Sequence, residues 1–290
     1  DDLPLRYSHS QKENPLSVVR QTIAIFKKHH VPEVYGFINA VRLEDAPKEI
    51  MQLRYWRKAG YPLGNHTYSH TDFNHVPLAA FKTEIEKNEA VLQKLAGKSD
   101  WKLMRFPYLS YGDPQKREEL FGYLKQRGYR TAYTSLDFQD WRWIDPYLRC
   151  KKRDATLSIR KMKKLYMENA IDSLERTEAI SHVLFKRDVP YILLLHISEF
   201  NVHMLDDMLT EYEKRGVTFI TLNEALEDPV YQQFGLYADK LDKRYNDSDV
   251  WQAWRGPLTL PGFTLDVYED RPADVLATMC QPEPVNQARN

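Results

Sequence analysis

Residues 34–40, VYGFINA, and residues 46–61, APKEIMQLRYWRKAGY, decide the fold class of this chain. The first stretch is short, apolar and rich in β-formers, which favours a buried strand. The second predicts a helix that Gly60 and Pro62 bring to an end. On either side of this pair, the sequence predicts further helices at 15–30, 78–95, 113–128, 157–186 and 204–215. It predicts further strands at 101–108, 130–136, 190–198 and 217–221. Repeated strand–helix alternation predicts a parallel α/β architecture, open or closed into a barrel.

The alternation stops near residue 228, so we expect one main domain over residues 1–228. Residues 229–290 are rich in Pro, Tyr, Trp and acids, and are predicted to be a C-terminal extension packed on the barrel. Within the main domain, about 142–187 is predicted to be an insertion that holds the long polar helix.

The composition excludes several function classes. Among 290 residues, 42% are hydrophobic and 28% charged, as in ordinary soluble proteins. Lys+Arg and Asp+Glu are both 41, so no basic field attracts nucleic acid. No apolar run approaches the roughly 20 residues of a transmembrane helix. Nothing in the composition defines the oligomeric state.

Polar side chains stand where the predicted strands end. In parallel α/β folds the chemistry gathers at the C-terminal ends of the strands. The residues found at or just beyond those ends are His66, His70, Arg105, Tyr108, Asp140 and His196.

The stretch LGNHTYSH (63–70) places two histidines four residues apart in a polar turn. If that turn is roughly helical, His66 and His70 lie on the same side and can bind one cation. Taken alone, the pair is more often two solvated loop histidines than a pair of metal ligands. A hydrolytic zinc site usually takes three protein ligands from His and carboxylates and leaves one position for water. The third ligand should therefore be an acid at another strand end.

Five short motifs occur in order along the chain: DDLP (1–4), HTYSH (66–70), RFPY (105–108), DFQDW (137–141) and LLLH (193–196). This set resembles the polysaccharide deacetylases with a NodB homology domain, carbohydrate esterase family 4. The resemblance covers the chain from Asp1 to about Leu226. It implies a distorted, incomplete (β/α) barrel and a metal-dependent hydrolase that removes N-acetyl groups from an N-acetylated polysaccharide or oligosaccharide.

The resemblance also implies a metal site and a base. Asp2, His66 and His70 match the metal ligands, with Zn²⁺ or another divalent transition metal as the ion. Asp1 matches the general base, and Arg105 would hold Asp1 ionised and aimed.

The remaining roles concern the proton donor and the substrate. His196 matches the general acid, and Asp140 would orient it. The backbone N–H of Tyr108 would help to bind the oxyanion. Trp141 and Leu194 would line a small pocket for the acetyl methyl.

Two positions depart from the family pattern, since Leu3 and Leu109 stand where glycine is usual. Both lie toward the substrate groove. The family also carries an apolar strand before its Asp pair, so we expect the natural polypeptide to be longer and to begin before Asp1. We further expect an exported protein, periplasmic or extracellular, in which Cys150 and Cys280 form a disulfide; otherwise they are free buried thiols.

Two other functions stay open from the sequence. One is an amide hydrolase for a small, non-sugar substrate, and the other is a catalytically inactive carbohydrate-binding homologue. The sequence does not distinguish chitin-like, peptidoglycan and exopolysaccharide substrates.

Overall fold

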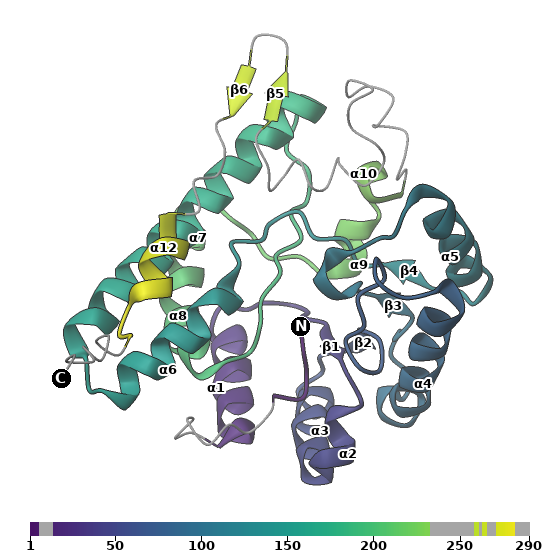
Figure 1. The fold of residues 1–290 in the computed structure, drawn as a ribbon. Coiled ribbons are helices and arrows are strands. Elements are labelled where there is room, and N and C mark those ends of the chain that lie inside the picture. The colour runs from purple at the N-terminus through teal and green to yellow at the C-terminus, as the bar shows by residue number, and fades with distance from the viewer. Residues whose placement is uncertain (6–13, 233–257, 261–262, 266–270, 282–290) are drawn as a thin grey trace, which may run out of the picture.

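The computed structural model describes residues 1–5, 14–232, 258–260, 263–265 and 271–281. Its centre is a parallel sheet with the strand order β1-β2-β3-β4 (Figure 1). These strands are β1 (Gly36–Ile38), β2 (Leu63–Asn65), β3 (Leu103–Met104) and β4 (Arg130–Thr131). Gly36 pairs with Leu63, Asn65 with Met104, and β3 with β4 in the same direction. The predicted parallel α/β architecture is confirmed.

Backbone contacts continue beyond both edges of this sheet. Leu3 forms a parallel bridge with β1, and on the other side Leu136 forms one with Leu193. The backbone nitrogen of Asp1 donates to the carbonyl of Leu195, which joins the two ends of the arrangement. The pairing thus runs round a ring with gaps, as predicted for a distorted, incomplete barrel.

Helices surround the sheet, and their sequence signals are readable at the caps. The helix α1 (Pro15–Lys28) begins at Asn14, whose side chain accepts a hydrogen bond from the N–H of Leu16. The helix α5 (Pro114–Gln126) begins in the same way at Asp113. The other helices before residue 145 are α2 (Arg42–Asp45), η1 (Pro47–Glu49), α3 (Ile50–Lys58), α4 (Leu78–Ala96), η2 (Pro107–Leu109) and η3 (Asp140–Trp143).

The second half of the chain is mostly helical. It contains α6 (Ile144–Lys152), α7 (Thr156–Phe185), α8 (Glu199–Lys214), α9 (Leu222–Leu226) and α10 (Pro229–Gln232). The helix α7 is the long polar helix of the predicted insertion, whereas α6 was not predicted. Short β5 (Leu258–Leu260) and β6 (Phe263–Leu265) pair antiparallel, and α12 (Arg271–Thr278) follows them.

Two apolar clusters support the barrel. One contains Phe26, Trp56 and Phe200 and joins α1, α3 and α8. The other contains Phe81 and Phe106, whose rings stack 5.8 Å apart beneath the sheet residues of β3. Since both clusters pack against the strands, the loops at the strand ends rest on a rigid base.

Two predicted strands are wrong. Residues 190–198 are extended but carry only the single bridge at Leu193, and residues 217–221 form no strand. Both are rich in β-formers, but such residues form a strand only where a neighbour offers backbone partners. In the second segment Ile220 is exposed, whereas Val217 and Phe219 pack partly buried against the core.

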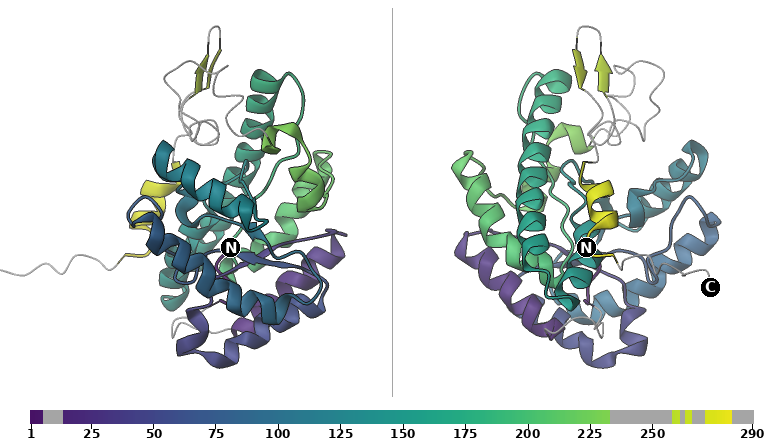
Figure 2. Two further views of the ribbon diagram at one scale, coloured as in Figure 1. Left: turned by 90° about the vertical axis from the view of Figure 1, so that its right-hand side faces the viewer. Right: turned by 60° about the vertical axis from the view of Figure 1, so that its left-hand side comes forward.

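The end of the chain is tied to the insertion. Cys150 of α6 and Cys280 form a disulfide, the pairing that was expected if the protein is exported. Beside it, Arg149 donates to the carbonyls of Leu276 and Met279. The helix α12 contacts α7 and η3, and the views agree that it lies alongside α7 (Figures 1 and 2). Among the helices that the structure describes, none is both long and apolar enough to cross a membrane.

Candidate active site

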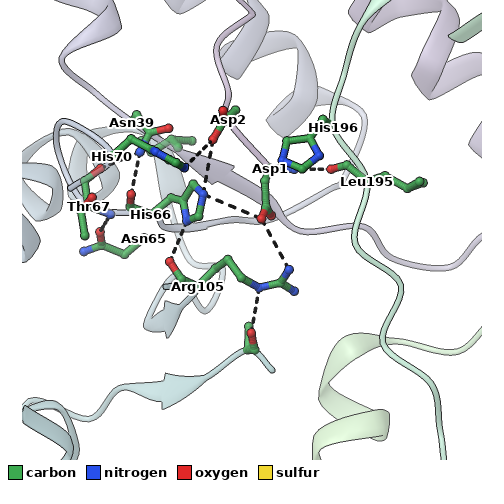
Figure 3. Close-up of polar contacts among 12 residues, drawn as sticks. Asp1, Asp2, Asn39, Asn65, His66, Thr67, His70, Arg105, Leu195 and His196 are labelled. Atoms are coloured by element: carbon green, nitrogen blue, oxygen red, sulfur yellow. Dashed lines mark hydrogen bonds and ion pairs between the residues drawn. The ribbon is translucent and has the colours of Figure 1, made fainter. Parts of the chain in front are cut away.

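The two loop histidines follow β2 directly, and a set of buried asparagines fixes their loop. Asn39 donates to the carbonyls of His66 and Thr67, at 2.6 and 3.0 Å (Figure 3). The Oδ1 atom of Asn65 accepts from the N–H of Thr67 at 3.0 Å and from Asn88 at 2.9 Å. Asn39 directly follows β1, Asn65 ends β2 and Asn88 lies in α4, so three parts of the fold hold the loop.

His66, His70 and Asp2 meet in one cluster, as the sequence predicted. The Nε2 atoms of His66 and His70 lie 3.3 and 3.4 Å from Oδ1 of Asp2 (Figure 3). The three ligand atoms all lie within 4.8 Å of one another. Tetrahedral zinc with bonds of about 2.0–2.1 Å places neighbouring ligand atoms about 3.3–3.4 Å apart. The spacing in this cluster therefore fits a tetrahedral cation.

The protonation of the cluster also fits a cation. Nδ1 of His66 lies 2.6 Å from the carbonyl of Arg105, to which it donates, so a neutral ring turns the lone pair of Nε2 toward Asp2. Burial lowers the pKa of His66, and burial also lowers the pKa of His70, to about 4. Both rings are then neutral ligands near neutral pH.

Asp2 completes this arrangement as a carboxylate. Oδ2 of Asp2 accepts a hydrogen bond from the Arg42 guanidinium at 3.0 Å, and this positive charge favours the ionised carboxyl group. Its Oδ1 atom is buried and accepts no hydrogen bond from any group in the described part of the chain. A cation among these atoms would satisfy both the ionised oxygen of Asp2 and the Nε2 lone pair of His66. The residues present fit the divalent metal that the sequence predicted.

Asp1 lies next to this cluster and is also buried. Its Oδ2 is 3.5 Å from Nη1 of Arg105 and 3.8 Å from Nε2 of His66 (Figure 3). Arg105 is itself fixed by a 2.8 Å hydrogen bond from Nε to the carbonyl of Ala132. The structure thus brings Asp1 and Arg105 together as the sequence predicted.

His196 and Asp140 form a second unit. Nδ1 of His196 donates to Oδ1 of Asp140 at 2.7 Å, and the backbone N–H of His196 donates to Oδ2 at 2.7 Å. Asp140 is fully buried, whereas the side chain of His196 is partly exposed. With Nδ1 occupied by Asp140, the Nε2 atom of His196 is the one available to a substrate. The backbone link from Asp1 to Leu195 places this histidine beside the cluster (Figure 3).

Tyr108 and Trp141 are exposed near the site, by 64% and 50%. The ring of Tyr108 packs 4.5 Å from the ring of His70. Tyr108 and Leu109 both have a left-handed backbone, with φ of 56° and 52°. Glycine suits such a conformation best, so Leu109, at a usual glycine position, retains the glycine-like backbone with a side chain attached.

Leu194 and Trp141 differ in their exposure to solvent. Leu194 is buried and lines a cavity of about 780 Å³ that also touches Asp1, Arg105 and His196. Trp141 does not line this cavity. The acetyl pocket predicted for Trp141 and Leu194 stays a prediction.

Sequence reasoning missed three residues that support the site. Arg42 donates to Oδ2 of Asp2 at 3.0 Å and to the backbone carbonyl of Asp2. Asn201 donates to Oδ2 of Asp140 at 2.8 Å, and Asn88 supports the histidine loop. Asparagines directly after short strands, as in FIN and LGN, were a usable signal for the loop support. Nothing in the sequence marks Arg42, because its partner is about 40 residues away.

Comparison with known proteins shows what this chain is similar to. The polysaccharide deacetylase family model matches residues 7–132. A peptidoglycan-N-acetylmuramic acid deacetylase of Bacillus subtilis, PdaA, is 24% identical over 207 residues, which are 71% of this chain and 65% of the relative. A chitin deacetylase of Arthroderma benhamiae is 22% identical over 218 residues, 75% of this chain and 50% of the relative. The chain thus spans about two thirds or less of these two relatives.

Solved structures show the same fold. A mutant of a family-4 carbohydrate esterase pseudoenzyme has a TM-score of 0.55 at 14% identity, covering 78% of this chain and 65% of that one. The peptidoglycan deacetylase PdaC of Bacillus subtilis has a TM-score of 0.50 at 19% identity, covering 81% and 93%. The fold predicted from the resemblance is therefore confirmed. In sequence and in fold, the chain is therefore similar to the polysaccharide deacetylases.

Proposed function

We propose that this protein is a metal-dependent hydrolase that removes N-acetyl groups from an N-acetylated glycan. The observation that carries the proposal is the cluster of Asp2, His66 and His70, with ligand atoms 3.3 and 3.4 Å apart around a buried, ionised oxygen. A cation at that cluster would stand next to one buried acid and one histidine, which are the two proton-transfer groups that amide hydrolysis needs.

Asp2, His66 and His70 would hold a divalent ion, with Zn²⁺ the best match to one carboxylate and two imidazoles. When bound, the ion supplies an activated water and polarises the acetyl carbonyl. Arg42 keeps Oδ2 of Asp2 engaged, so Oδ1 is the oxygen presented to the ion.

Asp1 would act as the base. It takes a proton from the attacking water while the oxygen of that water bonds to the acetyl carbon. The Arg105 guanidinium, 3.5 Å away, favours the ionised form of Asp1 that can accept this proton. Because Arg105 also bonds backbone carbonyls after β4, it fixes the position of Asp1 as well as its charge.

His196 would act as the acid. Protonated His196 donates the proton on Nε2 to the amide nitrogen as the carbon–nitrogen bond breaks, which releases acetate and a free amine. The buried Asp140 carboxylate stabilises the imidazolium and keeps Nδ1 turned inward.

The substrate contacts follow from the exposed residues. The backbone N–H of Tyr108 would bind the oxyanion, and its left-handed backbone sets the direction of that N–H. The exposed ring of Trp141 would contact the sugar or its acetyl methyl, and Leu194 would contact the methyl from the buried side.

Peptidoglycan and chitin-like glycans are the substrates to examine first, since the relatives are named for them. An exported protein would meet such polymers, and the Cys150–Cys280 disulfide supports export because disulfides persist in oxidising compartments.

The test is release of acetate from peptidoglycan fragments, chitin oligomers and an acetylated exopolysaccharide, with a small N-acetylated amide alongside. We expect zinc-loaded protein to release acetate from at least one glycan, and Asp1→Asn protein to release none. Release from the small amide alone would replace the glycan assignment. Binding of glycan without any acetate would mean an inactive homologue.

A further inference from the structure

We propose that Asn201 is a positioning residue for the proton donor, acting on His196 through Asp140. This inference rests on the proposed role of His196 as the acid. It starts from the hydrogen bonds of one buried carboxylate. Oδ1 of Asp140 accepts from Nδ1 of His196, while Oδ2 accepts from the backbone N–H of His196 and from Nδ2 of Asn201, at 2.7 and 2.8 Å.

Asn201 is fixed from both sides. It lies in the first turn of α8, where its backbone N–H donates to the side chain of the N-cap Ser198 at 3.0 Å. Its Nδ2 group also donates to the carbonyl of His196 at 2.8 Å. Both hydrogens of the amide are therefore used, one on Asp140 and one on the backbone of His196.

The side-chain oxygen of Asn201 differs from the nitrogen, because it has no hydrogen-bond partner among the described residues. This Oδ1 atom is buried. A buried acceptor without a partner is unfavourable, so the site tolerates that cost to place two donors. Two donors aimed at Asp140 and at the backbone of His196 are what the placement of the acid requires.

The Asn201 hydrogen bond also sets how strongly Asp140 attracts the proton of His196. A donor on Oδ2 shares the negative charge of Asp140, which would otherwise act on His196 alone. The other charged or titratable groups that face His196 are Asp1 and Arg105 from the cavity and the neutral His70 across the site. Removing the Asn201 donor leaves those groups unchanged and strengthens the pull of Asp140. We therefore expect the His196 imidazole to keep its proton to higher pH and to donate it less readily.

The experiment compares Asn201→Leu with wild type and with a matched control, Asn169→Leu. Asn169 is also a buried asparagine, and it donates to the carbonyl of Phe138 at 2.7 Å, near Asp140 but not on it. Two quantities are measured: the alkaline limb of the pH profile of kcat/KM, and the titration midpoint of His196 by imidazole NMR in protein without substrate.

We expect both midpoints to rise by about half a pH unit to one unit in Asn201→Leu, a roughly 3- to 10-fold change in proton binding. We also expect kcat to fall roughly 10-fold or more with little change in KM, since the acid is displaced and not the glycan. Asn169→Leu should leave both midpoints where wild type has them. If Asn201→Leu does not fold, Asn201→Ala removes the same donor without added volume and should move both midpoints upward.

A midpoint equal to wild type, or moved to lower pH, in the folded Asn201 variant would overturn the positioning role. The NMR titration needs no turnover, so it separates this inference from the proposed function. If wild type releases no acetate while the midpoint still moves, the deacetylase assignment fails and the Asn201 contact stands.

Discussion

The two halves of the candidate site differ in how completely their carboxylate oxygens are hydrogen-bonded. The cation cluster of Asp2, His66 and His70 leaves one buried carboxylate oxygen without a hydrogen bond, facing two imidazole nitrogens. In the proton-donor half, both oxygens of Asp140 accept well-formed hydrogen bonds, one from His196 and one from Asn201. The first half is incomplete without a cation, whereas the second is complete within the chain.

This difference separates what each half can do. A cluster with lone pairs turned inward binds an ion and is destabilised when the ion is absent. A pair with every acceptor satisfied holds one imidazole nitrogen still and leaves the other free to exchange a proton. Substitutions in the first half should therefore change metal binding, and those in the second should change turnover alone.

The largest effect is expected from Asp1→Asn, which changes the base between the two halves. An amide cannot take the proton of the attacking water, so turnover should fall below detection. Metal content should stay at the wild-type level, because the three ligands remain. Acetate release and metal analysis on one preparation check both. Turnover within tenfold of wild type would show that another group is the base.

A smaller loss is expected from His196→Ala, on the order of 10²–10⁴-fold in kcat, the usual range for a positioned acid. The alkaline limb of the kcat/KM profile should flatten, because activity falls with rising pH as His196 loses its proton. Initial rates from pH 5 to 10 provide the comparison. A variant with near-normal activity and an unchanged alkaline limb would remove His196 from the mechanism.

The supports of the two halves differ in how far a sequence reveals them. His66 and His70 are four residues apart, so their meeting is a local property that spacing predicts. Asp140 and His196 are 56 residues apart, and only the ordered set of motifs joined them in advance. Arg42 and Asn201 act through folded geometry alone, and no local pattern distinguishes them from surface residues.

The fold shows the same division. Helices with caps and apolar spacing, such as α1 and α5, were predictable because their stabilisation is local. Residues 190–198 and 217–221 were predicted as strands and are not, because pairing depends on neighbours that composition does not show. The strands β3 and β4 are shorter than the predicted strands at 101–108 and 130–136 for the same reason, since their length also depends on pairing with neighbours.

A third prediction concerns the support of the cation cluster. Asn88→Leu removes the amide that bonds Ile38, Ala40 and Asn65, and leaves those buried groups without it. We expect a loss of about 2–3 kcal/mol in the free energy of unfolding, measured in urea. Gln93→Leu, on the exposed side of the same helix, should change it by less than about 0.5 kcal/mol. Equal values for the two variants would show that the network adds no stability.

The smallest effect is expected at Leu109, whose φ of 52° is unfavourable for any side chain with a Cβ. Leu109→Gly should be more stable than Leu109→Ala by roughly 0.5–1 kcal/mol, the reverse of the usual order. Thermal unfolding of the two variants decides this. If the alanine variant is the more stable one, the left-handed backbone at this position is not a source of strain.

Metal stoichiometry in His66→Ala and His196→Ala, purified and zinc-loaded in parallel, tests the division of the site most directly. His66→Ala should bind far less than one equivalent after dialysis, since two ligands seldom hold zinc tightly. His196→Ala should retain one equivalent, as wild type does. A full equivalent in His66→Ala, or loss of metal from His196→Ala, would contradict the assignment of cation binding to one half and proton donation to the other.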